Sequence, residues 1–183
     1  MSGEAAAKGQ ATVDIAIASE GDAASIAALA RDTFVAAFAA SNTPGNMALY
    51  VDKAFSEDKV RGELGDSAAT FFCAEKNGTP AGYAKLYRGA KQACVTGTRK
   101  VELQRIYVAP ASIGSGVGSM LLHSCIKMAL QEDFETLWLG VWEHNDGAIA
   151  FYRNNGFVDV GKQNFWLGTD QQTDRVMQLV LRA

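Results

Sequence analysis

The sequence predicts one α/β domain built on a mixed, mostly antiparallel sheet of about seven strands, flanked by about four helices. Strand-like and helix-like segments follow one another in the order β-α-α-β-β-β-α-β-α-β-β, and Asn77-Gly78 between two strand-like runs favours a tight hairpin. A chain of 183 residues, 48% of them hydrophobic, suits a single domain with a real core.

The first third of the chain predicts a tail, a strand and two helices. Residues 1–10 are Ala, Gly, Ser and charged residues without periodicity, so we expect a flexible tail there and one domain over residues 11–183. Val13, Ile15 and Ile17 alternate with other residues, as a strand requires. Apolar residues then recur at helical spacing from Ile26 to Phe38, and a second helical pattern covers residues 46–64.

The remaining elements follow from the same periodicities and from the glycine, proline and asparagine residues that separate them. The predicted strands are residues 69–74, 81–87, 101–108, 136–142, 157–162 and 175–181, and the predicted helices are residues 119–130 and 147–155.

Bulk charge excludes several classes of partner. Seventeen basic and twenty acidic residues give a net charge of -3, which offers no field to draw the protein onto nucleic acid or an anionic membrane. The apolar stretches are shorter than the roughly 20 residues that span a membrane, and the start lacks a secretory leader pattern. Cys73, Cys94 and Cys125 lack metal-ligand spacing. We therefore expect reduced thiols, no metal site and a cytoplasmic protein.

A glycine-rich turn follows the strand that ends at Val108. The segment YVAPASIGSGVGSMLL, residues 107–122, places Gly114, Gly116 and Gly118 just before a helix. Glycines allow close backbone approach and a helix N-terminus attracts anions, so the turn favours a phosphate, more specifically a pyrophosphate. The third position of a dinucleotide fingerprint is Ser119 here, and the Walker motif is missing. The alternative is a tight turn without a ligand.

A second motif, WEHNDGAIAFYRNNGF at residues 142–157, follows the next strand. Together the two motifs resemble the paired cofactor motifs of the GNAT superfamily of N-acetyltransferases. Within it, nearly the whole chain resembles the bacterial PaiA-type spermidine/spermine N-acetyltransferases. That likeness lies in Thr33-Phe34, Phe38, NTPGNM at 42–47, Tyr50, AFS at 54–56, FF at 71–72, GYAK at 82–85, RIYV at 105–108, WLGVWEHN at 138–145 and QTDRVM at 172–177.

The resemblance implies a GNAT fold whose sheet is splayed at an acetyl-CoA site, with acetyl-CoA as co-substrate. The implied cofactor-binding residues are Ile106, Tyr107, Val108, Ile113, Gly114, Ser115, Gly116, Val117, Gly118, Ser119, Asn145, Ala148, Phe151, Tyr152 and Arg153. Arg153 would contact the 3′-phosphate of CoA. The competing interpretation is that its side chain is simply solvated. The sequence departs from the superfamily at Ile113, where Gln or Arg is usual, so one side-chain contact to phosphate is missing.

Acetyl transfer to an amine needs a base, because an alkyl amine is almost fully protonated at pH 7. Glu102 matches the catalytic carboxylate of some superfamily members and is the leading base, with Glu143 as the alternative; a surface salt bridge is the competing interpretation for each. Tyr152 is the candidate acid for the leaving thiolate, and a tyrosine packed in the core is the competing interpretation.

The expected acceptor is a small-molecule primary amine. Asp52, Glu57, Asp58 and Glu63 would give residues 34–64 an acidic character that suits a polyamine, although basic residues are interleaved with them. The alternatives are a protein or peptide amine, or an acyl-CoA-binding module without turnover. The sequence leaves the oligomeric state open, with a homodimer as one option.

Overall fold

The computed structural model describes residues 12–182, so the prediction for the tail lies outside the described residues. Within that range the α/β class with a mixed sheet is confirmed, with five α-helices where four were expected. The strands are β1 Val13–Ile17, β2 Ala69–Lys76, β3 Thr79–Tyr87, β4 Lys100–Val108, β5 Thr136–Trp142, β6 Val158–Leu167 and β7 Asp170–Val180. The helices are α1 Ala23–Phe38, α2 Pro44–Ala54, α3 Glu57–Leu64, α4 Val117–Gln131 and α5 Asp146–Asn154.

The additional helix arises because the segment predicted as one helix, residues 46–64, forms two helices, α2 and α3. Phe55 is buried between α2 and α3, and the side chain of Ser56 accepts a hydrogen bond from the Lys59 amide at 3.3 Å. Thr43 caps α2 in the same way through the Asn46 amide. Each cap satisfies an amide that a helix start leaves free, so the chain can end one helix and begin another within two residues.

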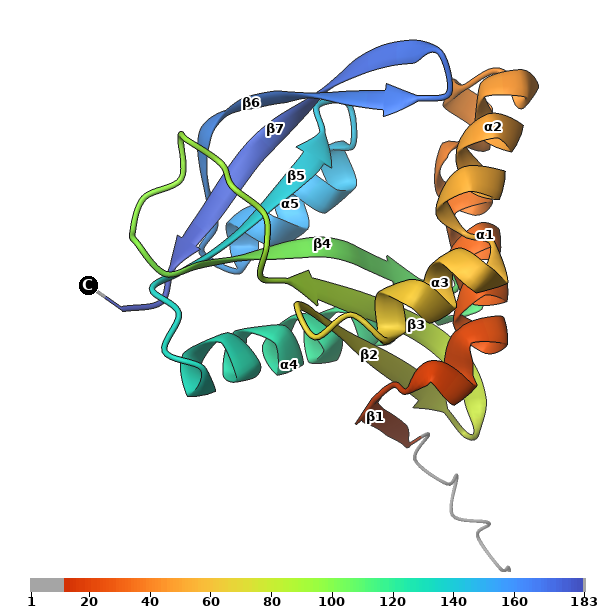
Figure 1. Cartoon of the computed structure of the whole chain (residues 1–183), viewed down its shortest axis with the longest axis horizontal. Coiled ribbons are helices and arrows are strands. Elements are labelled where there is room, and N and C mark those ends of the chain that lie inside the picture. The colour runs from red at the N-terminus through yellow and green to blue at the C-terminus, as the bar shows by residue number, and fades with distance from the viewer. Residues whose placement is uncertain (1–11, 183) are drawn as a thin grey trace, which may run out of the picture.

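The strands form one sheet in the order β1-β2-β3-β4-β5-β7-β6. The pair β4 and β5 is parallel and the other neighbouring pairs are antiparallel. The ladder between β4 and β5 covers three residue pairs and ends where Glu102 meets Trp138, after which the two strands diverge (Figure 1). The sheet is therefore splayed in its middle, as the resemblance implied.

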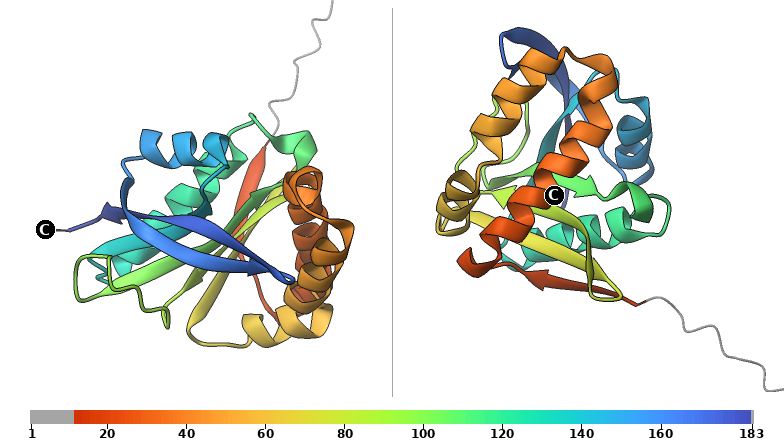
Figure 2. Two further views of the ribbon diagram at one scale, coloured as in Figure 1. Left: turned by 90° about the horizontal axis from the view of Figure 1, so that it is seen from above. Right: turned by 90° about the vertical axis from the view of Figure 1, so that its right-hand side faces the viewer.

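Helices cover both faces of the sheet (Figure 2). Residues of α4 and α5 pack into one core cluster with Val101, Leu103 and Leu139, while α1, α2 and α3 pack into another with Phe71 and Tyr83. Asn77 and Gly78 take positive φ angles of 52° and 74° between β2 and β3, which confirms the predicted hairpin turn.

The stretch Glu20–Ser41, which contains α1, is by length and composition apolar enough to cross a membrane, with a mean hydropathy of 1.4 over its best window. This contradicts the expectation that no stretch reaches that length. Within the fold, Ile26, Ala30 and Phe34 of this helix are buried in the same cluster as Tyr83 of β3. Packing on the sheet accounts for its apolar composition.

A bulge in β4 decides which side chains face α1 to α3. The register between β3 and β4 shifts at residues 85–86, where Gln104 is the extra residue of β4. Leu103 before the bulge and Ile106 after it consequently pack on the same face, toward α4. Arg105 points to the opposite face, where it meets α3. Strict alternation would have buried Arg105 in the apolar cluster under α4.

Candidate active site

A cleft of about 1220 Å³ opens where β4 and β5 diverge. Its walls come from α1, α2 and α3, from β3, from β4 and the turn that follows it, from β5 and α5, and from β6 and β7. Most of the predicted cofactor-binding residues line it, namely Ile106, Tyr107, Val108, Ile113, Gly114, Gly116, Gly118, Ser119, Asn145, Ala148, Phe151 and Tyr152.

The glycine turn leaves backbone donors at the edge of this cleft. Gly114 and Gly116 take φ angles of 77° and 87°, and Gly116 is the residue that precedes α4. The first backbone bond of the helix runs from the Met120 amide to the Gly116 carbonyl, at 3.0 Å. The amides from Val117 to Ser119 therefore have no acceptor inside the helix and can bind an anion.

Three predicted binding residues keep their side chains out of the cleft. Arg153 pairs with Asp159 at 2.7 Å on the surface. The hydroxyl of Ser115 donates to its own turn, at the Ser112 carbonyl. Val117 is fully buried in the core. Ser115 and Val117 can thus contribute backbone groups alone, and Arg153 lies outside the cleft.

Ile113 and Asn145 both line the cleft, and they differ in the polar groups that they offer to a ligand. Ile113 is 71% exposed and offers no polar atom at the head of the glycine turn. The side-chain oxygen of Asn145 accepts the Ala148 amide at 3.1 Å, which caps α5. The capping bond leaves the amino group of Asn145 available as a donor toward the cleft.

Tyr152 lies on α5 with its ring packed between those of Phe151 and Phe157. The side chain is buried yet borders the cleft. Burial raises the pKa of Tyr152 well above its ordinary value, and the neighbouring Cys125 adds to the effect. The phenol therefore keeps its proton to a higher pH than a free phenol and is a weaker acid.

The two predicted bases have different surroundings. Glu102 lines the cleft, where burial raises its pKa, opposed by a 3.3 Å hydrogen bond from Gln104 to its carboxylate. Glu143 accepts a hydrogen bond from Lys162 at 2.9 Å, which lowers its pKa, and it is not among the residues that line the cleft. Of the two, Glu102 is the one that lines the cleft and the one whose pKa is raised.

Three of the four acids expected to attract a polyamine, Asp52, Glu57 and Glu63, form ion pairs with cations of the protein itself, contrary to that expectation. Asp52 pairs with Arg31 at 2.8 Å, and Glu57 pairs with Arg61 one turn along α3. Among the four acidic residues named for this region, Glu63 is the one that lines the cleft. Helical spacing indicates the pair of Glu57 and Arg61, but it cannot show that α1 brings Arg31 to Asp52.

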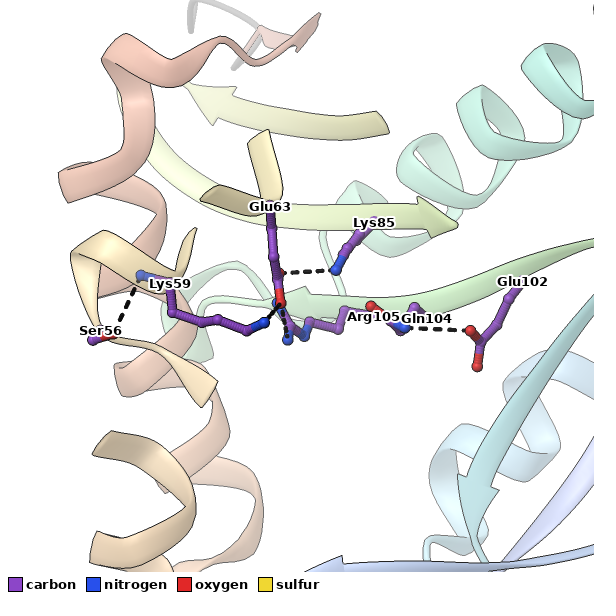
Figure 3. Close-up of polar contacts among 7 residues, drawn as sticks. All are labelled: Ser56, Lys59, Glu63, Lys85, Glu102, Gln104 and Arg105. Carbon is purple, nitrogen blue, oxygen red and sulfur yellow. Dashed lines mark hydrogen bonds and ion pairs between the residues drawn. The ribbon is translucent and has the colours of Figure 1, made fainter. Parts of the chain in front are cut away.

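The Glu63 carboxylate lies inside a cluster of three cations (Figure 3). It accepts hydrogen bonds from Lys85 at 2.8 Å and from Arg105 at 2.7 and 3.2 Å, and Lys59 lies 3.5 Å away. Burial acts to raise the pKa of Glu63, but Arg105 and Lys85 outweigh it, so the pKa is lowered. Glu63 is therefore ionised, and its hydrogen bonds fix the side chains of Lys85 and Arg105 in the wall of the cleft.

Sequence reasoning missed Gly140, Gln163 and Asp174, which line the cleft from β5, β6 and β7. Asp174 is buried, and burial raises its pKa from 3.8 to about 6 against a hydrogen bond from Gln163. A signal was present, since a glycine inside an apolar strand often marks a close approach. The partner that approaches Gly140 comes from strands 20 to 35 residues later, so the sequence could not identify it.

Among residues 12–182, no cluster of three or more His, Cys, Asp or Glu side chains could hold a metal ion. The cleft instead combines free helix amides, buried hydroxyl and carboxyl groups, and aromatic rings. Tyr50 stacks on Phe34 with ring centroids 4.7 Å apart, and lies 5.3 Å from the ring of Phe165. Such walls suit a ligand with a phosphate end and an apolar arm.

A protein-family model described as the acetyltransferase (GNAT) family matches residues 23–157. An uncharacterized N-acetyltransferase in the pepI 3′ region of Lactobacillus delbrueckii subsp. lactis is 33% identical over 92% of this chain and 98% of its own length. An uncharacterized N-acetyltransferase of Mycobacterium tuberculosis is 33% identical over 85% of this chain and 96% of its own length.

Solved structures share the fold. The PaiA N-acetyltransferase of Thermoplasma acidophilum in complex with coenzyme A superposes with a TM-score of 0.75 at 20% identity, over 92% of this chain and 99% of that one. The ribosomal-protein-S18-alanine N-acetyltransferase of Escherichia coli gives 0.68 at 22% identity, over 94% and 96% of the two chains.

Proposed function

We propose that this chain, which belongs to the GNAT family of acetyltransferases, acetylates the primary amine of a small molecule. A polyamine is the acceptor that we propose first. The chain is an N-acetyltransferase and acetyl-CoA is its co-substrate. The observation that carries the proposal is the cleft between β4 and β5, which has free helix amides at one end and buried acid and base candidates along its walls.

The residues present fit acetyl-CoA. Amides from Val117 to Ser119, reached past the two glycines with positive φ, would hold the diphosphate. Beyond the end of the β4–β5 ladder, the backbone of residues 106–108 would bind the amides of the pantetheine arm, and Asn145 would donate from the opposite wall. The bound thioester supplies the acyl group.

Glu102 and Tyr152 would carry the proton transfers. The acceptor enters as an ammonium ion, and Glu102, directly or through water, would accept a proton so that the neutral nitrogen can attack the thioester carbonyl. A backbone amide of β4 would stabilise the oxyanion that develops. The carbon–sulfur bond then breaks and CoA leaves as a thiolate, to which the Tyr152 hydroxyl would donate its proton. The nitrogen loses its second proton as the amide forms, and that proton would return to the Tyr152 oxygen through water.

A polyamine acceptor is supported by the sequence resemblance and by the cleft. Glu102 and Asp174 line the cleft without an ion pair to any residue in the described range. Carboxylates that lack a protein cation can bind the ammonium groups of an acceptor, and the rings of Tyr50 and Phe165 would contact its methylene chain. This support replaces the acidic helices, where Asp52, Glu57 and Glu63 are each paired with a cation of the protein.

Thiol-release kinetics test the proposed function. Acetyl-CoA mixed with protein and either spermidine, spermine, putrescine or butylamine should release free CoA at a rate that saturates with the amine. Peptides with a free N-terminus serve as the competing acceptor class and should react slowly. Release with peptides alone would favour a protein acetyltransferase, and binding of acetyl-CoA without release to any amine would favour a module without turnover.

Gly116→Ala is expected to weaken acetyl-CoA binding by about tenfold. The φ angle of 87° at this position costs a residue with a Cβ about 1–2 kcal/mol, and the turn relaxes by moving the amides that follow it. Calorimetry of acetyl-CoA binding measures the change. Gly45→Ala on α2, where an added Cβ meets no atom within 4 Å, is the matched control and should bind normally. Equal affinity of both variants would remove the turn from the cofactor site.

A further inference from the structure

Asp174 is a buried acid in the wall of the cleft, on β7. It lies opposite Trp142 of β5 and opposite Gln163 of β6, and it is 8% exposed. None of the ion pairs formed within residues 12–182 includes it. Its carboxylate borders the cleft, so a bound molecule can reach it.

Neighbouring residues hold Asp174 in place. Gln92 donates a hydrogen bond to the side-chain oxygen of Gln163 at 2.8 Å, and this bond leaves the Gln163 amino group to donate to Asp174. Gly140 makes room for the pair, because a Cβ on it would lie 3.0 Å from a carboxylate oxygen of Asp174 and closer still to the Gln163 amino group. Three strands thus combine to support one side chain.

The surroundings of Asp174 lack a compensating charge. Burial is the main reason that its pKa rises to about 6, and the hydrogen bond from Gln163 offsets only part of it. Tyr50 of α2 is a titratable group whose pKa Asp174 helps to raise, and the nearest strands present the neutral side chains of Gln163 and Trp142. Arg105 and Lys85 are engaged by Glu63. A buried carboxylate without a cation is costly, and a cationic ligand removes that cost.

We infer that Asp174 binds the ammonium group of the acceptor amine and so sets the specificity of this enzyme for cationic acceptors. This rests on the proposed function, since it requires an amine in the cleft. The ammonium ion would donate hydrogen bonds to the Asp174 carboxylate, which the hydrogen bond from Gln163 orients. The amine would then lie on the face of β5 and β7 that borders the cleft. Glu102 remains the group that accepts the proton, and Asp174 positions the amine.

The test replaces Asp174 by asparagine, which keeps the shape and removes the charge. The KM for butylamine, putrescine and spermidine should rise about 10- to 100-fold, the effect of losing one charge-assisted hydrogen bond, with kcat changed by less than about twofold. Asp14→Asn, an exposed acid on the far edge strand β1, is the matched control and should behave as wild type. Glu102→Gln should show the opposite split, with kcat reduced.

An unchanged amine KM in Asp174→Asn would overturn this inference. If kcat also falls at that unchanged KM, Asp174 would be the base. The pH profile adds a readout that a merely structural role would not move. Protonation of Asp174 should raise the wild-type amine KM as the pH falls through about 6, and Asp174→Asn should lack this rise.

Direct binding separates failure of this inference from failure of the proposed function. Butylamine is titrated by calorimetry into the protein saturated with CoA, a measurement that needs no turnover. Wild-type turnover with equal butylamine affinity in wild type and Asp174→Asn overturns the inference alone. Absence of CoA release with every amine overturns the proposed function, whatever the titration gives.

Discussion

Replacing Tyr152 with phenylalanine is expected to lower kcat by about 100-fold while the affinity for acetyl-CoA stays unchanged. The ring keeps its contacts with Phe151 and Phe157, so the cleft should retain its shape. What disappears is one donor beside the leaving sulfur, and a positioned donor of this kind contributes 10²-fold or more. Because burial raises the pKa of Tyr152, the wild-type enzyme should show no loss of activity from its ionisation at alkaline pH. Single-turnover kinetics and calorimetry measure the two effects.

Tyr83→Phe is the matched control for that experiment. The Tyr83 hydroxyl is buried without a hydrogen-bond partner in the described residues and is not among the groups that line the cleft. Removing it should leave kcat unchanged and cost no stability, since an unsatisfied hydroxyl contributes nothing favourable. Normal turnover in Tyr152→Phe would assign that tyrosine to core packing, the competing interpretation of the sequence.

Glu63→Gln is expected to lower the free energy of unfolding by about 3 kcal/mol at pH 7. The carboxylate and its two main partners are well buried, with side chains 12%, 5% and 12% exposed for Glu63, Lys85 and Arg105. Removing one partner from a buried ion pair leaves the others uncompensated, which costs about 3–5 kcal/mol. The lower end applies because Arg105 borders the cleft and Lys85, whose pKa burial already lowers, can release its proton. Denaturant unfolding at several pH values measures the loss.

The pH dependence of this difference follows from the lowered pKa of Glu63. The stabilisation is fully present above the ordinary glutamate pKa of 4.5 and is lost as the pH falls through the lower value of the folded state. The two proteins should therefore converge in stability in acid. Glu57→Gln removes an exposed pair with Arg61 on the same helix and should cost only a few tenths of a kcal/mol. Similar losses for both variants would show that the cluster around Glu63 carries no special weight.

The local elements and the cofactor motifs could be predicted from the sequence because each depends on residues close together in the chain. Alternation and helical spacing predicted the order of strands and helices except for the division between α2 and α3, and Asn77-Gly78 predicted the hairpin. The glycine turn was placed correctly before α4, since the positive φ angles and the helix start that follows are local properties. Expectations that relied on charge alone fared worse, as the paired acids of α2 and α3 show.

By itself the sequence determined the α/β class and the position of the glycine turn at the start of a helix. Through the family resemblance it also named Tyr152 and Glu102, which line the same cleft as that turn. Only the tertiary structure decided which charges are free and which are neutralised. The bulge at Gln104 turned Arg105 toward Glu63, and strands distant in the chain brought Gln163 and Asp174 over Gly140. The physical reason is that burial and ion pairing depend on groups far apart in sequence, so a carboxylate's charge state and partner exist only once the chain has folded.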